Sequence, residues 1–472
     1  MANLKSHLKE IFTLDLKSLS LLRILISLIL IWNIIERLVA VEVFFSDAGA
    51  IPLSIINSLT AWPWTFSFYH LSGNTLAQTG WLLLELTSAL CLLIGLKARF
   101  AVVLSWLFLC SAQTRNPLIL FSGDEALRMT LFWLMFLPID LYFSINKKVR
   151  LSINKDKSLN YYSLASAALI SQILIIYFFS GLHKINSYWI QGEALHYIYS
   201  GSHMVKPLGH FLLSTTPDWL LRLGGTTILC LEIFLPLAYL FFPVRSRLHL
   251  LFPIFFIFFH LFLDLTLRLE FFPYISIACL IVFFRSDMFF QHKILQETLK
   301  PKRTTLSNSL IAIFLLLAIY ANFRSLKTHA RDKSPIGIIT EALQLQQDWS
   351  MFSIPFTSDA IISAESITQE GHKIDLFSGK DVLTLATTTT STFDQYEYQR
   401  WLRLIAKTTF LRKEPYTADN LANWLCHKQN STNDSAKRIQ QIDFKMKTWP
   451  LPNNPNSLSD LKILPLGSYT CP

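Results

Sequence analysis

The sequence predicts an α-helical polytopic membrane protein with about nine transmembrane helices and a C-terminal α+β domain outside the membrane. Of the 472 residues, 52% are hydrophobic and only 16% are charged, whereas soluble domains carry about 25% charged residues. Apolar runs fill the first two thirds of the chain, and the last third is mixed and polar. The net charge of +10 comes largely from short loops between apolar runs. That placement is typical of membrane proteins and argues against nucleic-acid binding.

The apolar runs set the expected domain organisation. A membrane span needs roughly 20 mostly apolar residues, and the third and eighth runs are short enough to be tilted, buried or partly re-entrant. We expect a cytoplasmic segment at 1–20, a transmembrane domain at 21–323 and an extracytoplasmic domain at 324–472. The expected spans are 22–43, 78–95, 100–113, 126–143, 161–182, 220–242, 248–266, 271–284 and 308–323.

Loop charges predict the orientation. Lysine and arginine gather after the second, fourth, sixth and eighth spans, for example at Lys97, Arg99 and 147–157, whereas residues 45–77 contain neither. Loops rich in positive charge stay in the cytoplasm. The N-terminus is therefore expected inside the cell, and with nine spans the C-terminal domain is expected outside.

The last third of the chain carries clear secondary-structure patterns. Residues 360–376 alternate around a turn at Glu370-Gly371 and predict a hairpin. Residues 396–409 have helical spacing, and 442–446 alternate as in a strand. Thr417 is expected to cap a short helix that holds Leu421, Trp424 and Leu425.

The cysteines divide between the two parts of the chain. Four lie in apolar runs, where cysteine is a small apolar side chain, and Cys426 and Cys471 lie in the outer domain. No cysteine and histidine spacing resembles a zinc site, so we expect no metal. We hypothesise that Cys426 and Cys471 form a disulfide outside the cell, which would contribute about 2–4 kcal/mol.

The stretch from Tyr177 to Gly192 is the most informative part of the transmembrane domain. An apolar run that begins near Tyr161 ends on His183 and Lys184, and Trp189 follows. A lysine at the rim of a bilayer usually extends its ammonium to water, which is the structural alternative. Because Trp189 and more apolar sequence follow, the amine can instead lie in a cavity, where a desolvated lysine serves as a base.

Other polar residues in or beside the spans have structural alternatives as well. Glu36 and Arg37 close the first span and suit an ion pair that fixes helix packing. Ser122 or Asp124 can cap the helix that follows them. His260 lies inside the seventh span, and a lone histidine there is more often a hydrogen-bonded core residue than a catalyst.

Several motifs, taken in order, resemble those of the horizontally transferred transmembrane (HTTM) family, whose best-known member is the vitamin K-dependent gamma-carboxylase. The most specific is Tyr177-Phe-x-x-Gly-Leu-His-Lys184 followed by Trp189-Ile-x-Gly192. The others are Arg37 with 45–52, Arg115-Asn-Pro117 with Gly123-Asp124 and Leu127-Arg128, His260 with 271–274, and the tail segment 347–355, which is similar to that of bacterial members.

The resemblance implies a membrane enzyme of the carboxy-lyase type in the cell (inner) membrane of a bacterium. In the carboxylase, a lysine of this motif deprotonates reduced vitamin K, and Lys184 occupies its position. The implied cofactor is reduced vitamin K or a related quinol, and the implied partners are membrane lipid and a secreted or periplasmic polypeptide. We assign Lys184, His183 and His260 as catalytic candidates. The cofactor-binding candidates are Trp189, Tyr177, Arg115, Asp124 and Arg128.

Two departures from the carboxylase keep other functions open. Pro117 stands where the carboxylase has a histidine that serves carboxylation, and His183 replaces a second lysine. These changes leave quinol deprotonation possible and favour, as an alternative, a non-enzymatic maturation or assembly factor for a secreted client. A transporter ranks last, because no inverted repeat and no paired broken spans are recognisable.

Overall fold

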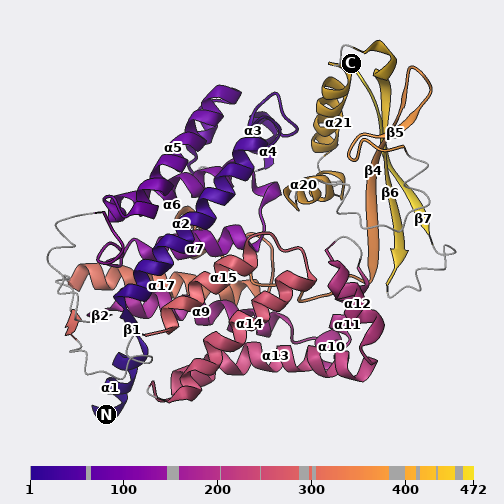
Figure 1. Cartoon of the computed structure of the whole chain (residues 1–472). Helices are drawn as coiled ribbons and strands as arrows, with labels where there is room; N and C mark the ends of the chain where they lie inside the picture. The colour runs from indigo at the N-terminus through magenta and orange to yellow at the C-terminus, as the bar shows by residue number, and fades with distance from the viewer. Residues whose placement is uncertain are drawn as a thin grey trace.

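The computed structural model describes residues 2–59, 65–145, 159–201, 204–244, 246–285, 297–299, 305–381, 399–410, 415–431, 434–451 and 461–472. A helical body carries a separate sheet domain at the end opposite the N-terminus (Figure 1). The basic loop residues at 147–157 and at 293–303 lie outside the described residues. The predicted membrane orientation therefore stays a prediction.

Every one of the nine predicted apolar runs forms a helix, but nine spans are not confirmed. Among the described residues, six helices are long and apolar enough to cross a membrane: α2, α5, α9, α13, α17, and α14 with the turn before it. α7 has 13 residues, about 20 Å at 1.5 Å per residue, against a hydrocarbon core of about 30 Å. α6 is not counted for a different reason, because its C-terminal end carries buried polar side chains. The nine helices are α2 (Leu16–Val39), α5 (Thr75–Ile94), α6 (Ala98–Arg115), α7 (Ser122–Leu134), α9 (Leu164–His183), α13 (Asp218–Phe241), α14 (Leu251–Thr266), α15 (Phe272–Leu280) and α17 (Thr305–Ser325).

Short helices and a small sheet complete the helical body. The sheet has the strand order β1-β2-β3, with β1 (Thr13–Asp15) antiparallel to β2 (Leu159–Tyr162), and β2 parallel to β3 (Glu297–Leu299). The shorter helices are α1 (Ala2–Ile11), α3 (Val41–Phe45), α4 (Leu53–Leu59), η1 (Phe68–His70), η2 (Pro117–Ile119), α10 (Ser187–Ile190), α11 (Ala194–Ser200), α12 (Pro207–Thr215), η3 (Arg247–Leu250), η4 (Ile281–Phe283) and α18 (Pro335–Ala342).

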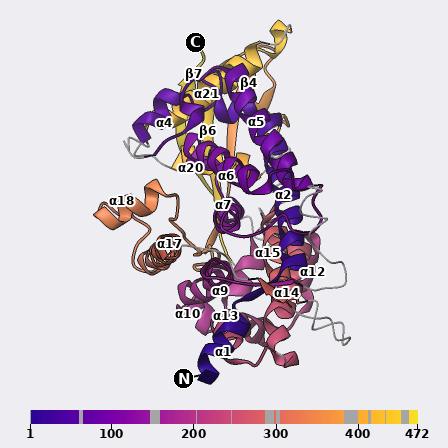
Figure 2. The ribbon, with the colours of Figure 1, turned by 90° about the vertical axis from the view of Figure 1, so that its left-hand side faces the viewer.

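α7 and α9 form the centre of the body. α7 is buried along nearly its whole length, and α9 packs on α7, α13 and α17. Figure 2 shows α7 and α9 between the other helices, with α17 and α18 on one flank. The core contains ion pairs: Arg37 contacts Glu85 at 3.4 Å and Asp124 at 3.7 Å. Glu36 pairs with Arg400, so Glu36 and Arg37 both form structural ion pairs as expected, each with a partner on another element.

The C-terminal domain, called the outer domain after its predicted location, is a four-stranded antiparallel sheet with two helices. Its strand order is β5-β4-β6-β7, formed by β4 (Ser358–Thr368), β5 (Lys373–Asp375), β6 (Ile439–Pro450) and β7 (Lys462–Thr470). The hairpin of β4 and β5 and the strand at 442–446 are confirmed. α20 (Gln399–Phe410) confirms the predicted helix. α21 (Pro415–Asn430) already includes Thr417, so Thr417 does not cap it.

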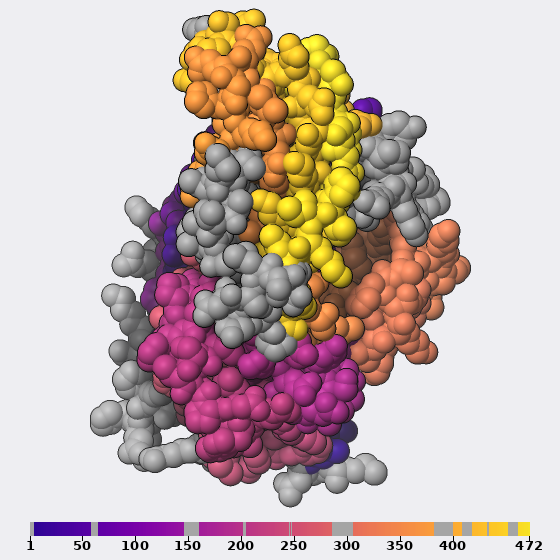
Figure 3. All heavy atoms as spheres, turned by 90° about the vertical axis from the view of Figure 1, so that its right-hand side faces the viewer, coloured from indigo at the N-terminus to yellow at the C-terminus, as the bar shows by residue number. Residues whose placement is uncertain are grey.

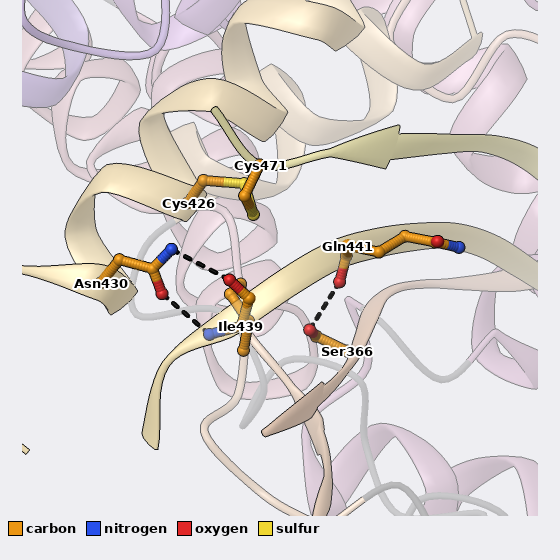
Figure 4. The surroundings of a disulfide bond; sticks show 6 residues. All are labelled: Ser366, Cys426, Asn430, Ile439, Gln441 and Cys471. Atoms are coloured by element: carbon orange, nitrogen blue, oxygen red, sulfur yellow. Dashed lines mark hydrogen bonds between the residues drawn. A yellow bond between two sulfur atoms is a disulfide. The ribbon is translucent and has the colours of Figure 1, made fainter. Parts of the chain in front are cut away.

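The predicted disulfide is present between Cys426 of α21 and Cys471 after β7. Figure 4 shows the bond next to the side chain of Asn430, which exchanges two hydrogen bonds with the backbone of Ile439. The two contacts together hold α21 against one end of the sheet.

α20 fastens the outer domain to the helical body. The buried Arg400 guanidinium donates to both carboxylate oxygens of Asp124 at 3.0 Å and lies over the ring of Phe121. Lys407 donates to the backbone oxygen of Pro117 at 3.1 Å. Figure 3 shows the sheet domain, in orange and yellow, above the magenta part of the helical body.

Candidate functional site

A small chamber lies at the end of α9, where the sequence motif of Lys184 is found. Its volume is about 60 Å³. α9, α11, α13, α14 and α15 form its walls. Met351 and Phe352 also line it and belong to residues 350–356, the outer segment. Its polar side chains are Tyr177, Ser180, Lys184, Trp189, Tyr199, Glu232, His260 and Ser276.

Lys184 is buried and has a carboxylate partner. Its Nζ lies 2.8 Å from Oε2 of Glu232 and donates to Oγ of Ser180 at 2.7 Å. Both charged side chains are only 5% exposed. The interpretation that Lys184 extends to water is therefore wrong, and so is the picture of an amine with an apolar surrounding alone.

A glycine brings the two partners together. Gly181 is one turn from the end of α9, and a Cβ added there would lie 2.7 Å from Ile233 and 3.1 Å from Glu232. Because only a hydrogen occupies this position, α9 and α13 can pack closely. α9 then ends at Lys184, whose backbone N–H bonds back to Gly181 and Leu182. This places the lysine side chain beside the middle of α13.

Tyr177 and His260 form a second polar pair on the chamber wall. The Tyr177 hydroxyl and Nε2 of His260 are hydrogen-bonded at 3.0 Å, and the Tyr177 ring lies against Phe256 with centroids 3.9 Å apart. Nδ1 of His260 has no partner among the described residues. His260 is therefore a hydrogen-bonded core residue that also lines the chamber.

Trp189 links the chamber to the outer segment. Its Nε1 donates to the backbone oxygens of Phe352 at 2.9 Å and Ser353 at 3.1 Å, and Asn186 donates to the same Ser353 oxygen. The indole ring lies 5.4 Å from Nζ of Lys184, within the range of a cation–π contact. Trp189 thus holds the outer segment over Lys184.

His183 faces away from Lys184. Its Nε2 bonds to the hydroxyl of Ser325 at 3.0 Å and lies 3.9 Å from the carboxylate of Asp348. Its ring stacks on His329, and it is not among the chamber residues. Successive helical residues point about 100° apart, so neighbours in the motif reach different surroundings.

Arg115, Asp124 and Arg128, the other predicted cofactor residues, lie outside the chamber. Arg115 donates to the backbone oxygens of Phe45 and Ile51. Asp124 binds Arg400, and its Oδ2 accepts the N–H of Phe121, so it also caps α7 as predicted. Arg128 donates to the side chain of Gln113 and the backbone of residue 346.

Sequence reasoning missed Glu232 as the partner of Lys184. A signal existed, because Glu232 is an ionisable residue inside the apolar run 220–242, and such residues usually pair and usually mark function. Among the residues that the structure describes, no group of three or more histidine, cysteine or acidic side chains is arranged to hold a metal ion.

Comparison with known proteins gives one match. The HTTM domain family matches residues 13–288, which include α9, α13, α14 and α15 and hence most of the chamber. No curated protein and no solved structure matches the chain.

Proposed function

The chain belongs to the HTTM domain family, and from this premise we propose that it is a membrane enzyme in which Lys184 takes a proton from an apolar substrate. The observation that carries the proposal is the buried pair of Lys184 and Glu232 on a chamber wall. A purely structural ion pair needs no cavity beside it. Here the amine, a hydroxyl and a carboxylate line one small cavity.

The pair can change its protonation without changing its net charge. When Glu232 holds the shared proton, the pair is an amine and a carboxylic acid, and no buried charge remains to be solvated. The amine of Lys184 can then accept a proton from a hydroxyl in the chamber. Glu232 acts as the proton store and Ser180 orients Nζ through the 2.7 Å bond.

A quinol is the substrate class that the lining favours. Aromatic side chains surround the chamber, which suits a flat apolar ring. Its 60 Å³ alone is too small, since ligand pockets usually measure about 300–1,000 Å³. A neighbouring cavity of 250 Å³ shares Ile198, Phe272, Met351 and Phe352 with the chamber. Movement of Met351 and Phe352 would join the two spaces. A bound quinol would supply an acidic hydroxyl and reducing electrons.

A larger cavity, whose lining includes several charged side chains, lies against α17, α18 and residues 344–348, and we propose that it receives an extracytoplasmic substrate. Its volume is about 470 Å³, and its lining includes His329, Arg331, Asp332 and Asp348. His183 bonds to Ser325, which also lines this cavity. If His183 takes part in the function, it therefore acts at this cavity and not together with Lys184.

The structure gives a reason to separate proton abstraction from carboxylation. The segment at Pro117 contacts the outer domain, because Lys407 and Arg400 donate to the backbone oxygens of Pro117 and Ile119. No side chain at this position can take the role of the carboxylase histidine. We therefore limit the proposed reaction to quinol-dependent chemistry that starts with Lys184.

The experiment is quinol turnover by the purified protein under oxygen, with reduced vitamin K as the probe. Lys184→Met should lower turnover at least about a hundredfold, as expected for loss of a general base. His183→Gln, which changes the neighbouring residue outside the chamber, is the matched control and should keep most of the activity. Equal turnover by the wild type and Lys184→Met would reject the proposal.

The alternative function is a non-enzymatic maturation or assembly factor. The observation in its favour is the attachment of the outer domain to the helical body through Arg400 and Lys407. Under this alternative, neither the wild type nor Lys184→Met turns over quinol, and a secreted client binds both equally. Client binding that is lost with Lys184→Met would contradict it.

A further inference from the structure

The second cavity, next to the Lys184 chamber, has an apolar wall and one charged residue among the described residues that line it. It measures about 250 Å³ and lies between the start of α7, α11, α15 and the outer segment 350–356. Its apolar lining residues are Phe121, Ile198, Met204, Val205, Leu269, Phe272, Met351, Phe352, Ile354, Pro355, Phe356 and Leu451. Ile354 and Phe356 are largely exposed, so the cavity has an apolar mouth.

Arg403 of α20 is the only charged residue among the described residues that line this cavity. Its Nε is buried without a hydrogen-bond partner, and no ion pair to it occurs among the described residues. The carboxylate of Asp124 attracts it, but that group already binds both nitrogens of Arg400. Burial lowers the pKa of Arg403, which means that its charge is incompletely compensated.

The polar neighbour of this cavity does not neutralise Arg403 either. The adjoining space of about 300 Å³ shares Phe121, Ser122, Ser350, Met351 and Arg403 with it. Its three carboxylates are Asp124, Glu125 and Asp348, and Arg128 is its second cation. Asp348 pairs with His329 at 2.6 Å, and burial raises the pKa of Glu125 to about 8. None of them bonds to Arg403.

We propose that the second cavity binds a single-chain amphiphile whose anionic head pairs with Arg403. A half-buried guanidinium whose Nε is buried without a partner is costly, and a carboxylate or phosphate would stabilise it through charge-assisted hydrogen bonds. The apolar wall takes the chain of such a molecule, and Ile354 and Phe356 mark its entry. Ser122 and Ser350 lie where the cavity meets its polar neighbour and offer hydroxyls to the head. An amphiphile bound here would occupy space that the proposed quinol site also uses, but its binding needs no reaction at Lys184.

The test measures binding of a nitroxide-labelled stearate and of its methyl ester to the full-length protein in uncharged detergent. The acid should bind about tenfold more tightly than the ester, because only the acid can pair with Arg403. Arg403→Gln should bring the ratio close to one, and Arg403→Lys should restore part of it. Unlabelled dodecanoate and dodecyl phosphate then show which head displaces the probe better.

The control variant is Arg438→Gln, which removes an exposed arginine of the outer domain and should leave the ratio unchanged. Ile354→Gln, at the apolar mouth, should weaken acid and ester by the same factor. Equal binding of acid and ester to the wild type would overturn the proposal. So would an unchanged preference in Arg403→Gln, or failure of both unlabelled compounds to displace the probe.

Discussion

Glu232→Gln tests the physical basis of the proposed site, because it removes the carboxylate that faces Lys184. The two side chains lie 2.8 Å apart and are 5% exposed. At this distance and an effective dielectric constant of about 20, their attraction is about 6 kcal/mol. Desolvation offsets part of it, but a partner left alone keeps the whole desolvation cost. We therefore expect Glu232→Gln to lower the free energy of unfolding by about 3–5 kcal/mol.

The double variant separates this effect from general damage to the core. Lys184→Met should cost a similar amount alone, and Lys184→Met combined with Glu232→Gln should cost clearly less than the sum. The expected coupling is about 2 kcal/mol or more. Reversible unfolding in mixed micelles, followed by tryptophan fluorescence, provides the four free energies. Ser88→Ala, which removes a buried hydrogen bond to Ser105 far from the pair in sequence, is the control.

Two results would refute the reasoning about the pair. A cost below about 1 kcal/mol for Glu232→Gln is the size found for exposed ion pairs. It would mean that the variant does not leave Lys184 as an unpaired buried charge. Costs that simply add in the double variant would show that the two residues do not interact. The first outcome would mean that the pair is uncharged at rest, and the second would remove Glu232 from the proposed proton store.

Three further predictions concern the outer domain. Burial lowers the pKa of Lys407 from 10.5 to about 8, so the unfolded chain binds the proton more tightly and stability should rise between pH 8 and 10.5, by at most roughly 3 kcal/mol. Lys407→Met should abolish that rise in denaturant titrations at the two ends of this range. Arg400→Met removes a buried pair to the helical body and should expose α20 to limited proteolysis at protease concentrations that leave the wild type intact. Replacing Cys426 and Cys471 by alanine opens a loop of 45 residues and should cost about 4 kcal/mol of domain stability, measured by thermal unfolding; an unchanged melting temperature would contradict this.

The sequence located the helices and the outer domain well, because both follow from local patterns. Apolar runs of the right length became helices, and alternation at 360–376 became a hairpin. The number of spans was not determined, because a run such as 126–143 mixes a short buried helix with the turns after it. Burial inside the body and burial in lipid leave the same apolar composition in the sequence.

The site was predicted only in part. The motif identified Lys184 and Trp189, and the structure places both at the chamber. Glu232 was missed because its contact with Lys184 joins two helices that are 48 residues apart, and no local pattern specifies such packing. His183 was grouped with Lys184 because they are adjacent in sequence, but adjacent residues of a helix face different neighbours.

Infrared difference spectroscopy tests most directly whether Lys184 and Glu232 exchange a proton when substrate binds. Reduced vitamin K is added to the purified protein under anaerobic conditions, and the carbonyl band of a protonated carboxyl group is followed. We predict that binding changes this band in the wild type and in His183→Gln, and that Glu232→Gln lacks the change. An identical band change in Glu232→Gln, or none in the wild type despite quinol binding, would contradict the central claim.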